Sequence, residues 1–182
     1  QTGSGKTFSM EGVKEPDGTY SSRGLIPRIF EGIFKYFSAD ETVKGFEVSM
    51  QFVELYNEQL QDLFGKRKVV EAKSDPSGGY QCKDAVRETM TSEKDGLKKY
   101  DAGCKMRATA ATNMNAVSSR SHALLIVQVA WSEQKGKSFS QLNLVDLAGS
   151  EGMKKTGASG AAAKEGIRIN LSLTKLAFVV KC

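Results

Sequence analysis

The residues best suited to chemistry stand at the start of the chain, where Gly3-Ser4-Gly5-Lys6-Thr7 matches the second half of the phosphate-binding pattern GxxxxGK[ST]. The first glycine of that pattern would precede Gln1. Glycines let consecutive backbone N–H groups turn toward a phosphate, and the following helix adds its positive N-terminus. We expect Lys6 to reach the β- and γ-phosphates of a nucleotide and the Thr7 hydroxyl to ligate Mg²⁺. A chance Gly-rich turn is the alternative that this motif alone leaves open.

Two further segments carry groups that suit a nucleotide site. Asp146-Leu147-Ala148-Gly149 follows an apolar strand, where the aspartate could hold the Mg²⁺ shell and Gly149 could bring its N–H to a γ-phosphate. Alone, such an Asp-x-x-Gly is often only a turn. In Asn115–His122, Ser118 and Ser119 offer hydroxyls to Mg²⁺ and water, and Arg120 offers a partner for Glu151.

Hydrophobic periodicity predicts the elements that position these residues. Apolar residues recur at helical spacing, which predicts helices over residues 26–37, over 91–103 and from about Lys164 onward. Between residues 11 and 24 a polar stretch intervenes, with a turn at Pro16-Asp17-Gly18.

Strands are predicted over residues 46–52, 123–131 and 139–145. The first alternates and is expected to carry a bulge near its end. The other two are apolar on both faces, so both are expected to be buried in a hairpin. Residues 57–80 look irregular, and Lys66-Arg67-Lys68 within them reads best as a solvated loop. Strands alternating with helices predict an α/β layered domain.

Composition bounds the class of protein. The 182 residues fit one domain, and 40% apolar with 26% charged residues excludes a disordered or fibrous chain. No apolar run approaches the roughly 18 residues of a membrane helix, and the first residues show no signal-peptide pattern. Three scattered cysteines and one histidine argue against a disulfide framework or a zinc site and favour a reducing compartment.

The net charge of +5 is concentrated near one end. Residues 151–182 carry six basic residues against Glu151 and Glu165, whereas the rest of the chain is almost balanced. This asymmetry favours an acidic partner for that end, with a solvated helix face as the plainer alternative.

Together these segments resemble the kinesin motor domain. Residues 1–7 match the family's GQTGSGKT without its leading glycine, Asn115–His122 reads NAVSSRSH like its switch I, and Asn143–Glu151 reads NLVDLAGSE like its switch II. Further matches, in family order, are Gly24–Arg28, Glu54–Glu58, Arg107 with Ala110–Asn115, Thr156–Ala158 and Lys164–Gly166.

The resemblance implies a P-loop NTPase fold, a three-layer α/β sandwich with a mixed central β-sheet flanked by helices. It implies that residues 1–182 are part of a motor domain. The expected segments are a phosphate loop at 1–7, switch I at 113–122, switch II at 146–151, and a microtubule-facing loop and helix at 152–182.

The implied cofactors are ATP and Mg²⁺. Phosphate contacts would come from Gln1, Thr2, Gly3, Ser4, Gly5, Lys6 and Thr7. Thr7 and Ser119 would ligate Mg²⁺, with Asp146 acting through water.

The two switch segments would act on the γ-phosphate. Asn115 and Ser118 would face that phosphate or the attacking water, Arg120 and Glu151 would form a salt bridge that closes the switches, and Gly149 would sense the phosphate. No strong protein base is required, because phosphoryl transfer depends mainly on positioning and charge stabilisation.

The implied partner of the basic end is the acidic microtubule surface. The contact residues would be Lys154, Lys155, Lys164, Arg168, Lys175 and Lys181. The resemblance further implies a cytoplasmic, microtubule-associated protein that dimerises through a coiled-coil stalk outside this chain. It implies neither nucleic-acid binding nor membrane insertion.

Two departures bear on this expectation. Leu171 stands where the family has the lysine of I-N-K-S-L, which weakens the expected microtubule contact, and Ala177 replaces a glycine.

The family also has strands before the phosphate loop and further elements after the last helix. We therefore expect a fragment of a longer motor, inactive and poorly folded alone, with exposed sheet edges and apolar surface.

Three alternatives stay open from the sequence. A GTPase would share the phosphate loop, but the chain has no Asn-Lys-x-Asp segment to read guanine. A non-catalytic kinesin-like domain could bind microtubules without turnover. Nucleic-acid binding ranks third, because aromatic residues do not interleave with the basic ones.

Overall fold

The computed structural model describes residues 5–74, 80–109, 121–133 and 136–149, together with residues 171 and 174–175, which are helical. Three helices and ten strands are described: α1 (Lys6–Glu11), β1 (Gly12–Lys14), β2 (Tyr20–Arg23), α2 (Leu25–Ala39), β3 (Gly45–Tyr56), β4 (Gln59–Asp62), β5 (Lys68–Val70), β6 (Lys73–Ser74), β7 (Tyr80–Gln81), β8 (Glu88–Met90), α3 (Glu93–Thr109), β9 (His122–Glu133) and β10 (Gly136–Asp146). Among the helices of these segments, none is long and apolar enough to cross a membrane.

A six-stranded sheet forms the centre of the molecule. Its strand order is β10-β9-β3-β4-β5, and β8 pairs with β3 on the side that also carries β4. Every pairing between the described strands is antiparallel. The two long pairings, β3 with β9 and β9 with β10, hold the strand ends in a fixed register.

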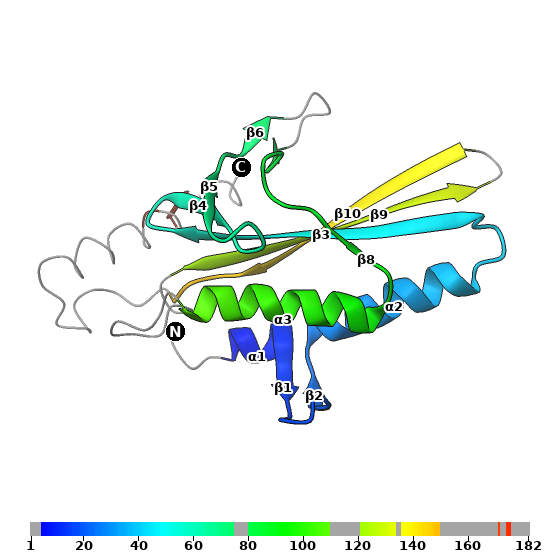
Figure 1. The fold of residues 1–182 in the computed structure, drawn as a ribbon, viewed down its shortest axis with the longest axis horizontal. Helices are drawn as coiled ribbons and strands as arrows, with labels where there is room; N and C mark the ends of the chain where they lie inside the picture. The colour runs from blue at the N-terminus through cyan, green and yellow to red at the C-terminus, as the bar shows by residue number, and fades with distance from the viewer. Residues whose placement is uncertain are drawn as a thin grey trace, which may run out of the picture.

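The three helices α1, α2 and α3 lie along one face of the sheet (Figure 1). Ile26 and Phe30 of α2 and Tyr100 of α3 pack there on alternate residues of β3 and β9 to form the main core. A smaller cluster around Val53, Val70 and Cys82 belongs to the other face of β3. This arrangement confirms the predicted α/β fold.

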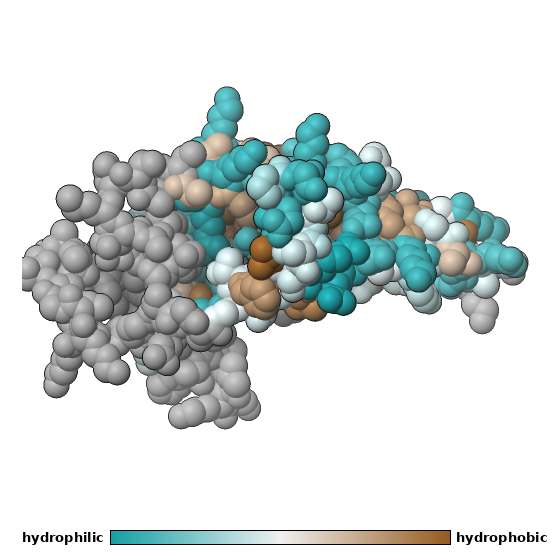
Figure 2. Space-filling model, turned by 90° about the horizontal axis from the view of Figure 1, so that it is seen from below, coloured by the Kyte–Doolittle hydropathy of each residue, from teal (hydrophilic) through white to brown (hydrophobic). Residues whose placement is uncertain are grey.

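The surface of the helical side agrees with this packing. Figure 2 shows that it is mainly hydrophilic, with apolar residues scattered rather than gathered. Helix α2 illustrates the reason, because Ile26, Pro27 and Phe30 are buried under it while Tyr36 is exposed.

The prediction of a bulge near the end of the first strand is wrong. β3 runs unbroken for 12 residues and keeps one register with β9 from Gly45↔Ser132 to Leu55↔His122. The alternation of apolar and polar residues breaks at Val53 because the middle of β3 is buried on both faces. In such a strand the polarity of a residue does not indicate which face its side chain lies on.

Two other expectations about strands need correction. Residues 57–80 are not irregular throughout, because β4, β5 and β6 lie in this stretch, each too short to show alternation. The hairpin of β9 and β10 is confirmed, but only β9 is buried. Among the described strands β10 has a neighbour on one side only, and Phe139, Leu142 and Val145 are exposed on it. Exposed apolar surface at a sheet edge was itself expected from the sequence.

Helix ends and turns follow their local chemistry. The helix predicted over 91–103 runs to Thr109, six residues further, and Ser92 Oγ accepts a hydrogen bond from the Asp95 N–H at its start. Between α1 and α2 the polar stretch forms the β1–β2 hairpin, with the predicted turn closed by Thr19 O accepting from Glu15 N–H at 2.8 Å. An ion pair joins Lys14 of this hairpin to Asp101 of α3.

Helix α3 approaches the sheet closely at a glycine, which gives a stability prediction. A Cβ at Gly103 would lie 2.5 Å from Cδ1 of the buried Phe52 ring. We expect Gly103→Ala to lower the free energy of unfolding by about 1–2 kcal/mol, because overpacking outweighs the gain in helix propensity. Thermal unfolding of the complete protein measures this.

Gly32→Ala is the matched control, because Gly32 also lies inside a helix but a Cβ there would meet no atom within 4 Å. We expect it to be neutral or slightly stabilising. Equal effects of the two substitutions would contradict the packing described for α3.

Candidate functional site

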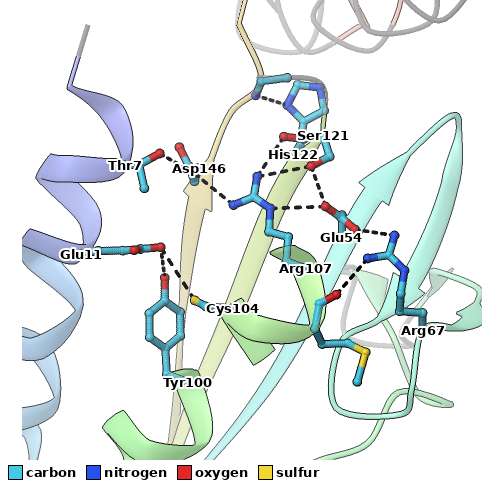
Figure 3. Close-up of polar contacts among 12 residues, drawn as sticks. Thr7, Glu11, Glu54, Arg67, Tyr100, Cys104, Arg107, Ser121, His122 and Asp146 are labelled. Carbon is cyan, nitrogen blue, oxygen red and sulfur yellow. Dashed lines mark hydrogen bonds and ion pairs between the residues drawn. The ribbon is translucent and has the colours of Figure 1, made fainter. Parts of the chain in front are cut away.

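The candidate site lies where α1 meets the carboxyl end of β10. α1 begins directly after Gly5, whose φ of 79° is readily adopted only without a side chain. This start directs Thr7 at the last residue of β10, and Thr7 Oγ1 donates a hydrogen bond to Asp146 Oδ2 at 3.3 Å (Figure 3). Two residues that the sequence assigned to Mg²⁺ are thus brought together from positions 139 residues apart.

The polar atoms here fit a magnesium ion. Asp146 is only 8% exposed, and its Oδ1 is buried without a hydrogen-bond partner in the described structure. A buried carboxylate oxygen without a partner is unfavourable, and a metal-bound water would satisfy it. A hydroxyl and a carboxylate oxygen are also the ligand types that Mg²⁺ takes in phosphate sites, with most of its shell left to water and phosphate.

An arginine of α3 holds Asp146 from the other side. Arg107 Nη1 lies 3.3 Å from Asp146 Oδ2, its Nε lies 3.3 Å from Glu54 Oε1, and its Nη2 donates to the backbone oxygen of Ser121 at 3.1 Å. These three contacts hold the guanidinium between Glu54 of β3 and Asp146 at the end of β10, as Figure 3 shows. Its orientation limits where the Asp146 carboxylate can point.

Glu54 is the buried counter-charge of this network. Its side chain is fully buried, and its Oε1 accepts a hydrogen bond from Ser121 Oγ at 2.6 Å. Its Oε2 lies 2.8 Å from Arg67 Nη2, an ion pair without hydrogen-bond geometry in the described structure. The positive charges of two arginines thus balance the negative charges of two carboxylates in this network. Buried charges are tolerated when they are paired in this way.

His122 fixes the segment that follows β10. Its Nδ1 accepts a hydrogen bond from the Ala148 N–H at 3.0 Å, next to the buried Gly149. Burial lowers the pKa of His122, and the Arg107 guanidinium lowers it further. The imidazole is therefore kept neutral, the state in which Nδ1 can accept.

This contact predicts a pH dependence of stability. Because the folded-state pKa lies below the value near 6.5 of an unfolded histidine, the stabilisation is complete above that value and is lost as pH falls through the folded-state pKa. We expect the free energy of unfolding to fall between pH 7 and 5, and to fall less in His122→Asn, whose amide oxygen can still accept. Denaturant titrations at both pH values measure this, and parallel pH profiles would contradict it.

A second polar cluster joins α1 to α3. Glu11 Oε1 accepts hydrogen bonds from the Tyr100 hydroxyl at 2.9 Å and from Cys104 Sγ at 3.8 Å. Burial raises the pKa of Cys104 to about 12 and also raises the pKa of Tyr100. Both groups therefore stay protonated and act as donors, which fixes the far end of the helix that carries Thr7.

Several predicted site residues lie outside the described residues. These are Gln1, Thr2, Gly3, Ser4, Asn115, Ser118, Ser119, Arg120, Glu151, Lys154, Lys155, Lys164, Arg168 and Lys181. Their roles stay predictions. Of the predicted basic contact residues, Lys175 is described, and its Nζ lies 3.2 Å from Glu58 Oε2 in an exposed ion pair.

Sequence reasoning did not assign Arg107, Glu54, Ser121 or Arg67 to the site. The sequence did indicate a role for Glu54, because this carboxylate stands between the apolar residues Val53 and Leu55. A charge buried in such a strand requires a partner. Arg67 carried none, and the expectation that it belongs to a solvated loop is wrong. Its neighbours Lys66 and Lys68 are exposed, but Arg67 turns inward to Glu54.

Comparison with known proteins decides the family. The kinesin motor domain model matches residues 1–182. The chain belongs to the kinesin motor family. It is 40% identical over 184 aligned residues to kinesin-related protein 3 of Dictyostelium discoideum, covering 99% of this chain but 15% of that protein.

Solved kinesins share the fold. A KIF14 dimer in its two-heads-bound state, with AMP-PNP and in complex with a microtubule, aligns with a TM-score of 0.79 and 34% identity over 97% of this chain. A fast kinesin, whose structure was analysed for its ATPase mechanism and microtubule interactions, aligns with a TM-score of 0.79 and 33% identity. This kinesin chain spans about half of each, 51% and 48%. The P-loop NTPase fold is thereby confirmed.

Proposed function

We propose that this chain is the nucleotide-binding part of an ATP-hydrolysing, microtubule-based motor. The observation that carries the proposal is the contact of Thr7 with Asp146, whose second oxygen is buried without a partner in the described structure. Kinesin motor domains are ATPases that bind nucleotide, so the family supports the same reaction.

The proposed chemistry rests on positioning rather than on a strong base. Lys6 would bind the β- and γ-phosphates, and Thr7 and Asp146 would hold Mg²⁺, the aspartate through water. Arg107 fixes the orientation of the Asp146 carboxylate. Mg²⁺, when bound, would neutralise charge that develops on the phosphates. Gly149, at the end of the segment held by His122, is buried where its N–H could meet a γ-phosphate.

The other members of the site stay proposals from the resemblance. Residues 1–7 form the phosphate loop, 113–122 switch I and 146–151 switch II. Ser119 completes the metal ligands, Asn115 and Ser118 face the γ-phosphate or water, and Arg120 pairs with Glu151. Loss of the γ-phosphate would release these contacts, which suits a site that switches as well as hydrolyses.

We further propose that residues 152–182 face the microtubule in the cytoplasm. Support comes from the basic excess of this segment and from the KIF14 neighbour, which was solved in complex with a microtubule. Lys175 would exchange its exposed partner Glu58 for an acidic residue of tubulin, and loss of the Glu58 contact would cost little free energy because exposed ion pairs are weak.

Steady-state nucleotide turnover by the complete protein tests the proposal. We expect ATP turnover that rises when microtubules are added, and weak turnover of GTP. Equal turnover of ATP and GTP with no stimulation would overturn the motor and favour the GTPase reading. Microtubule binding with no turnover of either nucleotide would favour a non-catalytic domain.

A further inference from the structure

Helix α1 carries Lys6 and Thr7 but has little apolar contact with the rest of the described structure. None of its six residues is fully buried, and Met10 packs against the main core from a partly buried position. Its last residue is joined to α2 through the backbone, where Gly24 N–H donates to Glu11 O at 3.3 Å. Helices in proteins are stabilised mainly by tertiary packing, so the direction of this poorly packed helix depends on its polar side-chain contacts.

Polar contacts hold α1 at both ends. Thr7 and Glu11 lie on one face of the helix, because they are separated by about one turn. At the first turn, Thr7 Oγ1 donates to Asp146 Oδ2 at 3.3 Å. At the last residue, Glu11 Oε1 accepts from the Tyr100 hydroxyl at 2.9 Å (Figure 3). Both acceptors are carboxylates and the contact at Glu11 is the shorter, so α3 holds α1 more firmly than β10 does.

The α3 side of this contact is itself fixed to the sheet. Tyr100 is only 6% exposed, and its ring packs on that of Phe52 in β3 with the centroids 5.2 Å apart. One turn further along α3, Cys104 Sγ donates to the same Glu11 oxygen at 3.8 Å. The Tyr100 hydroxyl is therefore a rigid attachment point for α1, and Cys104 adds a weaker donor beside it.

We propose that Tyr100, assisted by Cys104, is a positioning residue that sets how long ADP stays bound. Its hydroxyl holds Glu11, and with it the whole of α1, against α3. Because Lys6 and Thr7 form the first turn of α1, they move away from the phosphates when the helix tilts, and tilting breaks the contact at Glu11. The inference rests on the proposed function, because it assumes that Lys6 and Thr7 bind nucleotide.

Tyr100→Phe isolates the hydroxyl, because the ring contact with Phe52 is available to phenylalanine as well. If the hydroxyl holds α1, its removal destabilises the bound state more than the tilted state through which ADP leaves, so release becomes faster. A purely structural hydroxyl would instead lower the free energy of unfolding and leave the rate of ADP release unchanged.

The rate at which the complete protein releases a fluorescent ADP tests the inference. The protein is loaded with the labelled nucleotide and mixed with excess unlabelled ATP in the absence of microtubules. For Tyr100→Phe we expect release to be about three- to tenfold faster, the range that one hydrogen bond contributes. Tyr36→Phe is the matched control, because it removes the same hydroxyl from an exposed tyrosine of α2, and we expect it to release ADP at the wild-type rate.

Variants of Glu11 test whether the hydroxyl acts through this carboxylate. Glu11→Gln keeps a side-chain oxygen that can accept from Tyr100, so we expect its release rate to stay closer to wild type than that of Glu11→Ala. Glu11→Ala should release ADP at least as fast as Tyr100→Phe. Adding Tyr100→Phe to Glu11→Ala should cause no further acceleration, because the hydroxyl then has no partner on α1.

Each contrary result has a defined meaning. ADP release from Tyr100→Phe at or below the rate of Tyr36→Phe would overturn the inference alone. So would acceleration by Tyr100→Phe that persists in full when Glu11 is alanine. Should Glu11→Ala fail to fold, the comparison of Tyr100→Phe with Tyr36→Phe is sufficient. Wild-type protein that binds no ADP would instead overturn the proposed function.

Discussion

Replacing Lys6 by alanine is expected to lower ATP turnover about a hundredfold or more. Lys6 follows Gly5 at the first residue of α1, where its ammonium group is the one phosphate-neutralising side chain of the GK[ST] motif. Charge on the transferred phosphoryl group must be stabilised in the transition state, and removal of one such group typically lowers turnover by a factor of about 10²–10³. Single-turnover measurements with saturating ATP separate this loss from weaker binding.

Lys35→Ala is the control for the Lys6 substitution. Lys35 lies on α2 and is exposed, so the same change of charge should leave turnover within about twofold of wild type. A Lys6→Ala protein that retains wild-type turnover would show that the Gly-rich segment is a turn without a phosphate role.

Arg107→Met is expected to lower the free energy of unfolding by about 3–5 kcal/mol, because it leaves Glu54 and Asp146 buried without their shared partner. We expect this loss to exceed that of the exposed ion pairs among the described residues, since desolvated charges cannot bind water instead. Chemical denaturation of the complete protein, with and without saturating nucleotide, measures it.

Two variants define what Arg107 contributes. Arg107→Lys keeps the charge but cannot span Glu54, Asp146 and Ser121 at once, so we expect an intermediate loss. Arg87→Met, at an exposed arginine, should change stability by less than about 0.5 kcal/mol. If Arg107→Met were as harmless as Arg87→Met, the buried network would not be the support of Asp146.

Much of the fold could be predicted because long elements carry strong periodicity. The apolar face of α2 and the two-sided apolar run of β9 are visible in the sequence, and their partners follow from the need to bury them. The short strands β4 to β7 could not be predicted, since two to four residues show no period. Nor could the exposure of β10, because an edge position depends on which strands are its neighbours.

The residues of the candidate site likewise fall into those that the sequence predicts and those that it does not. Gly5, Lys6, Thr7 and Asp146 were predicted because their chemistry is local and their spacing is distinctive. The contact of Arg67 with Glu54 depends on a turn folding back over the end of α3, which no local pattern records. Long-range ion pairs of this kind are set by tertiary packing, so sequence reasoning can flag the buried charge but not its partner.

The most direct test of the central claim is the affinity of the complete protein for microtubules in two nucleotide states. Co-sedimentation in the presence of AMP-PNP and of ADP measures whether the site around Thr7 and Asp146 controls track binding. We predict affinities that differ by about fivefold or more, the range of a typical allosteric coupling, and a difference that disappears in Lys6→Ala. Equal affinities in AMP-PNP and ADP for the wild-type protein would contradict a nucleotide-switched motor.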